Sequence, residues 1–274
     1  MEALYTALIL GTIEGLTEFL PISSTGHLII ATDILKLDQG KYSSFNIIIQ
    51  LGAILAVVFL YHTRFRNFCS IRNLMDLIND FKVGKTSSAL NSIHIAIAIL
   101  PTLAIGYLSR HFIKTHLFNP YVVVSSLVIV GVVMIIIEKI KPTPVLNSVD
   151  ELSYKDAFLI GFSQCFALIP GVSRSGATML CAMMRKVDVK TAADFSFLIS
   201  VPVIAIATGY EFLKSYSSFN ANDAFLLFVG FVVSFIVALA AIKGFLAVLK
   251  KLSLTPFAFY RIFLGLWYYF FYLR

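Results

Sequence analysis

Two acidic residues, three hydroxyl residues and a histidine stand close together near the start of a chain that is otherwise mostly hydrocarbon. Glu14 and Glu18 are four residues apart, so on a helix their carboxylates lie on one face. Pro21 ends such a helix, because it has no N–H group to donate and its ring clashes with the preceding turn. Polar groups are costly at membrane depth and mark function there. We therefore expect a functional loop after the helix, with the residues Ser23, Ser24, Thr25, Gly26 and His27.

A second polar cluster, 150 residues later, repeats this design. Residues 173–176 (Ser-Arg-Ser-Gly) align with residues 23–26 (Ser-Ser-Thr-Gly), and the alignment continues downstream without a gap. Before the loop the register slips, since Glu18 precedes the first serine by five residues whereas Gln164 precedes its counterpart by nine. One added helical turn in the second copy accounts for this difference. We interpret the alignment as an internal duplication.

The two clusters together favour the transfer of a phosphoryl group. Arg174 carries a permanent charge on a planar fork that suits two phosphate oxygens. The helices that begin after the two loops, at Gly26 and Gly176, add free N–H groups and a dipole that attract an anion. Glu14 and Glu18 are suited to hold a divalent cation, or one of them to act as a base.

A hydroxyl and an imidazole supply the remaining parts of such a site. Ser24 aligns with Arg174 in the repeat, so the two should face one another across a pseudo-two-fold axis. We expect Ser24 to be the reacting hydroxyl and His27, three residues later, its proton partner, with Ser23 secondary. Spacing alone leaves open which residue performs which step, and attack by water is the alternative. The expected phosphate-binding residues are Ser23, Thr25, Gly26, Ser173, Ser175, Gly176 and Thr178.

The composition places this chain in a membrane. Its residues are 58% hydrophobic and only 14% charged, with a mean hydropathy of +0.86, whereas a soluble domain has about 25% charged residues. A soluble helical protein would interrupt its apolar runs with charges at each turn. Several runs approach the roughly 20 residues that cross a bilayer. We predict full crossings at about 45–61, 92–109, 120–138, 195–213, 224–249 and 256–273.

The number of crossings predicts an inverted repeat. Residues 3–20 and 24–36 are separated by the polar loop and form a re-entrant hairpin, which membranes tolerate where it is buried in protein. Each copy then has one hairpin and three crossings, so the second copy enters the membrane from the opposite side. The predicted fold is an all-α polytopic membrane protein with an inverted-topology repeat, six full transmembrane helices and two re-entrant helix-loop-helix hairpins. Repeat one covers about 1–138 with its tip at 21–27, and repeat two about 156–274 with its tip at 170–178.

The distribution of basic residues predicts the orientation. The net charge of +7 would suggest nucleic acid in a soluble protein, but here the basic residues stand in loops, where topology and lipid head groups explain them. Of the 22 basic residues, 14 fall on one side of the predicted arrangement and 6 on the other. The basic loops are therefore expected in the cytoplasm and both termini outside. The N-terminus has no basic region or cleavage site, so we expect no removable signal peptide.

Two segments resemble the motifs of a known enzyme family. Residues 14–27 (EGLTEFLPISSTGH) are similar to the (E/Q)xxxE-containing motif of the undecaprenyl-diphosphate phosphatases, also called UppP or BacA after bacitracin resistance. Residues 170–178 (PGVSRSGAT) resemble the second motif of that family, PGxSRSxxT. The similarity runs the length of the chain, through IQLGAILAVV from Ile49 and the closing PFAFYR.

The resemblance implies an integral membrane enzyme that hydrolyses undecaprenyl diphosphate to the monophosphate, and so recycles the lipid carrier of peptidoglycan and other cell-wall polymers. It also implies a multi-pass protein of the bacterial plasma (inner) membrane, with an active site that faces the periplasm or exterior. A divalent cation, Mg²⁺ or Ca²⁺, is the expected cofactor. The residues that match active-site positions of the family are Glu14, Glu18, Ser24, His27 and Arg174, with Ser23, Ser173, Ser175 and Thr178 in support.

Two other classes of function stay open. An inverted-repeat transporter or flippase of a polyprenyl phosphate has the same topology. A phosphate- or lipid-binding scaffold fits less well, since it leaves the glutamate pair and His27 without a task. The expected partners are undecaprenyl diphosphate and membrane lipids, with a homodimer as an open alternative and no nucleic acid.

The charge distribution makes a testable prediction for topology. In a background without the three native cysteines, cysteines introduced in residues 37–43 should react with a membrane-impermeant thiol reagent added outside intact cells. Cysteines introduced in residues 63–91 should not react. The opposite labelling pattern would reverse the predicted orientation.

Overall fold

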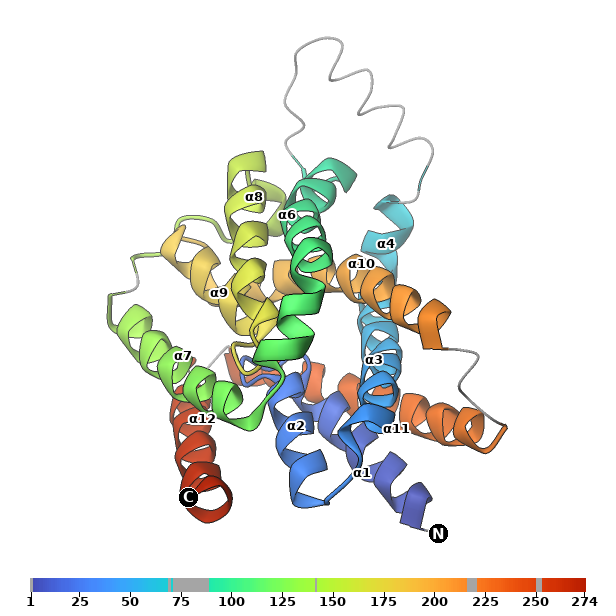
Figure 1. Cartoon of the computed structure of the whole chain (residues 1–274). Helices are drawn as coiled ribbons and strands as arrows, with labels where there is room; N and C mark the ends of the chain where they lie inside the picture. The colour runs from blue at the N-terminus through green and yellow to red at the C-terminus, as the bar shows by residue number, and fades with distance from the viewer. Residues whose placement is uncertain (1, 69, 71–88, 141, 216–220, 250–252) are drawn as a thin grey trace.

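The structure, a computed structural model, describes residues 2–68, 70, 89–140, 142–215, 221–249 and 253–274. These residues are mostly helical and contain no β-strand, which confirms the predicted all-α class (Figure 1). The helices are α1 (Glu2–Thr17), α2 (Ser24–Ile34), α3 (Gln39–Leu60), α4 (His62–Phe68), α6 (Ser92–Phe112), α7 (Pro120–Ile140), α8 (Tyr154–Ser163), α9 (Arg174–Met184), α10 (Val189–Ser215), α11 (Ala221–Leu249) and α12 (Thr255–Tyr268). Shorter 3₁₀ or π turns are η1 (Ile113–Leu117), η2 (Val149–Glu151), η3 (Gln164–Leu168) and η5 (Tyr269–Leu273).

Four helical stretches of the described chain are long and apolar enough to cross a bilayer. They contain the predicted crossings at 92–109, 120–138, 195–213 and 224–249, so the multi-pass character of the chain is confirmed at the level of helix length and composition. These stretches are Ser92–Leu117, Pro120–Ile140, Val189–Lys214 and Asp223–Leu249.

The other two predicted crossings differ from a simple spanning helix. The segment Ser44–Leu60 of α3 is long and apolar enough to cross a bilayer only when it is taken together with α4. The two helices are bent by 88° relative to each other. The crossing predicted at 256–273 is α12, which has 14 residues and continues into the π turn η5. The end of the first helix also differs, because α1 stops at Thr17 and residues 18–22 form a turn. Pro21 therefore lies inside the loop rather than at the point where the helix ends.

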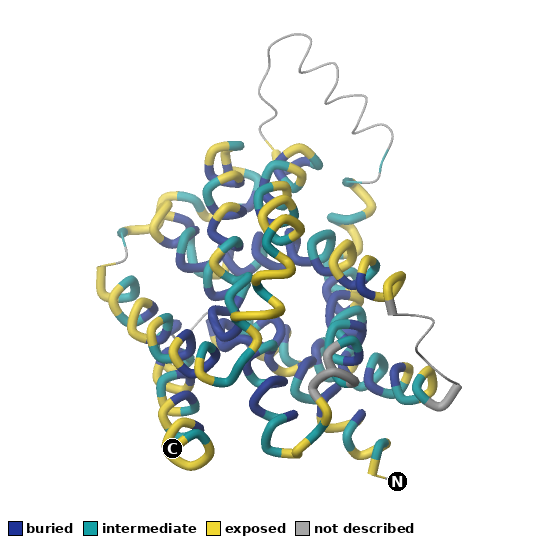
Figure 2. The backbone as a smooth tube through the Cα atoms, viewed as in Figure 1, coloured by how far each residue is buried: buried dark blue, intermediate teal, exposed yellow. Residues whose placement is uncertain are grey.

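Two helical hairpins approach each other from opposite ends of the molecule. Figure 1 shows α1 and α2 at one end and α8 and α9 at the other, with the loops of both hairpins between them. The region where these loops lie is buried, whereas the outer faces of the surrounding helices are exposed (Figure 2). An exposed apolar exterior around a buried polar centre is the arrangement expected of a helical membrane protein.

Backbone conformation repeats at a spacing of 150 residues. The four non-glycine residues with positive φ in the described chain form two such pairs: Ser23 (72°) with Ser173 (78°), and Lys36 (53°) with Lys186 (64°). Each pair stands at equivalent ends of the 11-residue helices α2 and α9. Left-handed backbone is rare outside glycine, so its recurrence at matched positions is more specific than the sequence alignment alone.

The helices α3 and α10 make matched contacts along an antiparallel pair. Tyr61, just after α3, bonds Asp194 near the start of α10 at 2.5 Å. Ser44, near the start of α3, lies 3.5 Å from Glu211 near the end of α10. Ser44 and Asp194 are 150 residues apart, as are Tyr61 and Glu211. Ser44 and Asp194 occupy one position of the repeat, and Tyr61 and Glu211 occupy another. These two positions are in contact at both ends of the helix pair, each time between one copy and the other.

Glycines at matched positions let one arm of each hairpin pack closely on a helix of the other half. A Cβ atom on Gly11 of α1 would lie 2.7 Å from the Gly230 oxygen of α11, and one on Gly161 of α8 would lie 2.1 Å from the Ala98 oxygen of α6. Neither approach leaves room for a side chain. Each half of the chain therefore supplies the helix on which the hairpin of the other half packs.

The matched glycines correct the predicted register slip before the loops. Gly11 and Gly161 are 150 residues apart, which places Glu14 over Gln164 without an inserted turn. Both of these side chains are buried, at 0% and 1% exposure. The two copies instead differ in helical winding. Residues 14–17 of the first copy belong to the α-helix α1, whereas the matching residues 164–167 belong to the 3₁₀ turn η3. Glu18 is therefore the counterpart of Leu168 rather than of Gln164.

The basic residues on the predicted cytoplasmic side are described only in part. Arg64 binds Asp150 through two nitrogens at 2.8 and 2.7 Å, and this guanidinium lowers the pKa of Asp150. Arg185 pairs with Asp156 at 2.8 Å. The residues of that side that lie outside the described ranges are Arg72, Lys82, Lys85, Lys141, Lys250 and Lys251.

The close packing of α8 on α6 predicts the effect of a single methyl group. Gly161→Ala should lower the free energy of unfolding by about 1–3 kcal/mol, because the backbone of Ala98 occupies the space. Gly244→Ala on α11 is the matched control, since nothing lies within 4 Å of its added Cβ. It should be neutral or stabilise by up to about 1 kcal/mol through helix propensity. The unfolding midpoint of the purified protein in detergent measures both, and equal midpoints would contradict the packing.

Candidate active site

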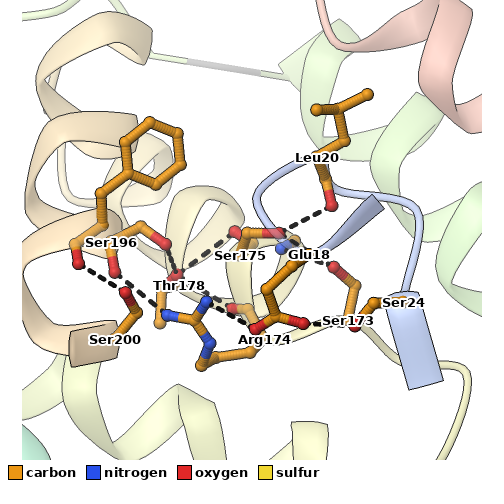
Figure 3. Close-up of polar contacts among 11 residues, drawn as sticks. Glu18, Leu20, Ser24, Ser173, Arg174, Ser175, Thr178, Ser196 and Ser200 are labelled. Carbon is orange, nitrogen blue, oxygen red and sulfur yellow. Dashed lines mark hydrogen bonds and ion pairs between the residues drawn. The ribbon is translucent and has the colours of Figure 1, made fainter. Parts of the chain in front are cut away.

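The two polar clusters identified in the sequence meet in space. Ser175 Oγ, at the start of α9, donates to the carbonyl oxygen of Leu20 in the first loop at 2.9 Å (Figure 3). A Cβ atom on Gly26 would lie 3.4 Å from the Cα atom of Gly171 in the second loop. Residues about 150 positions apart in the chain therefore line one site.

Each loop ends in a serine that caps the following helix. Ser23 Oγ accepts from the Gly26 N–H at 3.3 Å, and Ser173 Oγ accepts from the Gly176 N–H at 3.1 Å. Ser173 also lies 3.1 Å from Ser175 Oγ. These contacts satisfy first-turn N–H groups that a helix start leaves without partners. They agree with the supporting role expected for Ser23.

Glu18 connects the two loops through hydrogen bonds to its carboxylate group. One of its carboxylate oxygens accepts the hydroxyl hydrogen of Ser24 in a short contact, and the other accepts from Arg174 Nη2 at 3.0 Å. Both partners of the ion pair are buried, with 12% of the Arg174 side chain and 8% of the Glu18 side chain exposed. The expected proximity of Ser24 and Arg174 is therefore realised through one shared carboxylate (Figure 3).

Other contacts hold the Arg174 guanidinium in place. Nη1 donates to the carbonyl oxygen of Ser196 on α10 at 3.3 Å. The hydroxyl of Ser196 lies 2.7 Å from Thr178 Oγ1, on the turn of α9 that follows Arg174. Ser196 thus contacts both Arg174 and Thr178, although the sequence analysis did not place it at the site. Its alignment with Asn46, 150 residues earlier, gave no signal of this role.

Several polar groups in and around the two loops are buried without a partner among the described residues. They include Arg174 Nε and both carboxylate oxygens of Glu14, whose side chain is fully buried, and also Gln164 Oε1 and Arg261 Nε. Buried donors and acceptors are normally satisfied, so each orphan atom calls for an explanation. An N–H donor is suited to an anion and a carboxylate to a cation. Within the described residues there is no cluster of three or more His, Cys, Asp or Glu side chains.

His27 does not bond the Ser24 hydroxyl, in contrast to the expected pairing. Its Nδ1 lies 2.7 Å from the Ser23 carbonyl oxygen, which can only accept, so Nδ1 carries a hydrogen. In the neutral ring Nε2 then accepts from the hydroxyl of Tyr260 at 2.9 Å. The two rings are stacked, with centroids 5.6 Å apart and an angle of 7° between their planes.

Tyr260 was missed by sequence reasoning, although the segment that contains it was recognised. It belongs to the closing PFAFYR, at a distance of 233 residues from His27. The same segment contributes Arg261, whose side chain donates to backbone carbonyl groups of both loops. Nothing in local spacing connects these residues with the first loop.

Thr25 lies apart from the hydrogen-bonded centre and lines a cavity of about 150 Å³. The cavity lies between α2 and α3, and its other polar lining residues are Thr32, Asn46 and Gln50. Most of the remaining lining is aliphatic, from Leu28, Ile29 and Ile47. A cavity lined by both polar and apolar side chains thus borders the first loop at Thr25.

Comparison with known proteins gives matches over nearly the whole chain. Residues 7–267 match the family model "Bacitracin resistance protein BacA". Undecaprenyl-diphosphatase 1 of Bacillus thuringiensis subsp. konkukian is 43% identical over 266 residues, which are 97% of each chain. Undecaprenyl-diphosphatase of Maridesulfovibrio salexigens is 46% identical over 263 residues, 96% of each chain, and that of Sulfurihydrogenibium sp. is 45% identical over 269 residues, 97% of this chain and 98% of the relative.

The geometry predicts different outcomes for the two adjacent serines. Ser24→Ala should reduce turnover by two or more orders of magnitude, because it removes the hydroxyl that Glu18 binds. Ser23→Ala should retain most of the turnover but lower the stability by about 0.5–2 kcal/mol, because it removes a helix cap. Phosphate release and unfolding midpoints of the two variants measure these effects. Substantial turnover by Ser24→Ala would instead favour direct attack by water.

Proposed function

Because the chain belongs to the bacitracin resistance protein BacA family, we propose that it hydrolyses undecaprenyl diphosphate to undecaprenyl phosphate and inorganic phosphate. The observation that carries this proposal is that Glu18 contacts Ser24 and Arg174, which follow the two loops. Nearby, Arg174 Nε and the Glu14 carboxylate have no hydrogen-bond partner among the described residues. A reaction of this kind recycles a lipid carrier for peptidoglycan synthesis and opposes bacitracin. The relatives named undecaprenyl-diphosphatase, 43–46% identical to this chain, support the assignment.

In the proposed first step the Ser24 hydroxyl attacks the terminal phosphorus atom. Its hydrogen passes to the Glu18 oxygen that already accepts it, which makes Glu18 the base in place of His27. The bond from phosphorus to the bridging oxygen breaks, and undecaprenyl phosphate leaves with that oxygen. Water then attacks the phosphoserine, which releases inorganic phosphate and restores the serine hydroxyl.

Arg174 stabilises the charge that develops on the phosphoryl oxygens. Its Nε–H is free to donate, and its charge is fixed in place by Glu18 and the Ser196 carbonyl. A positioned donor in a buried site stabilises such a transition state more than water does. His27 is held by Tyr260 and the Ser23 carbonyl, and it is the candidate to protonate the departing oxygen or to activate the water.

Glu14 fits the divalent cation that the family resemblance implies. Its two buried oxygens have no partner among the described residues, and hard cations prefer carboxylate oxygens. Glu18 supplies the second carboxylate. Mg²⁺ or Ca²⁺ bound there would neutralise charge on the diphosphate and orient its oxygens.

We also propose the finer architecture of six crossings and two re-entrant hairpins in an inverted repeat. The pairs of left-handed residues and the matched ends of the antiparallel pair α3 and α10 support it. The excess of basic residues supports a cytoplasmic location for the C-terminal ends of α3 and α7 in this arrangement. The site would then open toward the periplasm or exterior of a bacterial plasma membrane.

Release of phosphate from a C55 isoprenyl diphosphate by the purified protein tests the function. We expect turnover that a chelator abolishes and that added Mg²⁺ or Ca²⁺ restores. A protein that moves a polyprenyl phosphate across liposomes without releasing phosphate would instead be the flippase alternative.

Glu14→Gln should raise the cation concentration needed for half-maximal activity by about tenfold or more, because an amide oxygen is a weaker ligand for a hard cation. Turnover at saturating cation should recover in large part. Glu2→Gln, an exposed position on the same helix, is the matched control and should leave the cation dependence unchanged. A rate loss at saturating cation with an unchanged midpoint would make Glu14 a base instead of a ligand.

A further inference from the structure

Arg261 on α12 carries a charge into the centre of the molecule, where its side chain is fully buried. We propose that Arg261 is a positioning residue that fixes the two loops of the active site relative to each other. The proposal rests on the proposed function, since it concerns the rate of that reaction. It also gives a task to the closing PFAFYR segment, which the mechanism otherwise uses only through Tyr260.

The shortest contacts of Arg261 divide between the two loops, while longer ones reach the Ser126 carbonyl oxygen and Met134 Sδ of α7, at 3.5 and 3.8 Å. Nη1 donates to the carbonyl oxygen of Pro21 in the first loop at 3.0 Å. Nη2 donates to the carbonyl oxygens of Gly171 and Val172 in the second loop, at 2.6 and 3.0 Å. One rigid planar group therefore spans both loops, with a separate nitrogen on each.

The Arg261 charge has no carboxylate partner in the described part of the chain. A buried charge without a counter-ion is costly, so mere filling of space does not explain an arginine at this position. The three carbonyl groups that it binds most closely, those of Pro21, Gly171 and Val172, belong to loop backbone, which has no helical partners to accept from. Such groups would be left unsatisfied in an apolar bundle, and the guanidinium satisfies three of them at once.

A glycine allows the second loop to reach this position. Gly171 has a φ of +94°, and a Cβ atom there would lie 2.7 Å from the Val123 oxygen of α7. The loop is therefore pressed against α7 while Arg261 holds its carbonyl groups from α12. Both helices that enclose the loops thus contribute to their placement.

The consequence for the reaction follows from what each loop carries. The first loop leads to Ser24 and contains Glu18, whereas the second leads to Arg174. The alignment of the attacking oxygen with the charge-stabilising arginine depends on the spacing of the loops. A misplacement of about 1 Å can cost about a hundredfold in rate. A lysine in place of Arg261 keeps the charge but has one nitrogen, which cannot take the place of two.

Arg261→Lys tests the proposal in a way that separates positioning from folding. We expect kcat for phosphate release to fall by about tenfold or more, with KM for the C55 diphosphate changed by less than about threefold. The unfolding midpoint should stay within a few degrees of wild type. Arg174→Lys, which alters a substrate contact, should differ by also raising KM. Arg110→Lys is the matched control, because Arg110 is exposed and bonds only the Tyr107 carbonyl of its own helix in the described structure.

An unchanged kcat in Arg261→Lys would overturn the inference, as would a loss of kcat that only parallels a loss of folded protein. Should the lysine variant fail to fold, Arg261→Gly is purified with millimolar guanidinium to occupy the vacated space. Its activity should then fall when guanidinium is removed and return when it is restored, and activity that persists without it would count against the proposal. Failure of the wild type to release phosphate would refute the function itself.

Discussion

Loop backbone inside an apolar bundle has to find hydrogen-bond partners within the protein, and much of this site follows from that constraint. The caps at Ser23 and Ser173 satisfy N–H groups at the helix starts. Ser175 and Arg261 satisfy carbonyl groups of the loops. The side-chain groups that remain without a partner around the loops, among the described residues, are those of Glu14, Gln164, Arg174 and Arg261. Under the proposed function, the unpartnered atoms of Arg174 and Glu14 would be satisfied by a phosphate group and a cation.

The chemistry arises where the two copies differ, within a framework that is similar in both. Ser23 and Ser173 have the same conformation and the same capping contact. The next residue is a serine in one copy and an arginine in the other, so in the proposed mechanism one loop supplies the nucleophile and its counterpart a charge. Glu14 and Gln164 differ in the same way, since only the first can carry a charge to a cation. A strictly symmetrical pair of loops would lack this division of roles.

Composition and periodicity were sufficient to predict the helical class, the membrane-length helices and the meeting of the two loops. These features depend on long apolar runs and on a repeat that residues 150 apart reveal directly. The pairing of Ser24 was wrong in detail, because helical spacing favoured His27 whereas the turn after Thr17 brings Glu18 back onto the serine. The predicted register slip was also wrong, because a 3₁₀ turn in one copy changes the winding without changing the number of residues.

Contacts contributed by α12 could not be predicted from local patterns. Tyr260 and Arg261 reach residues more than 230 positions earlier in the chain, and no periodicity links them to the first loop. Their contacts with the loops form only when α12, the third long helix of the second copy, is packed against α7. The closing PFAFYR segment resembles the family in sequence, but no local pattern indicates what its residues contact.

The exchange of packing partners between the halves has a consequence for how the protein is made. Helix α1 packs closely on α11 through Gly11, so this contact of the first hairpin forms only after residues beyond 221 have been synthesised, whereas α3 and α7 of its own half are made earlier. At about 5–20 residues per second, that delay is roughly 10 to 50 s. During that time the polar loop with Glu14 and Glu18 lacks the helices of the second half that complete its burial. We therefore expect the burial of this loop to be completed only when the second half has been inserted beside the first.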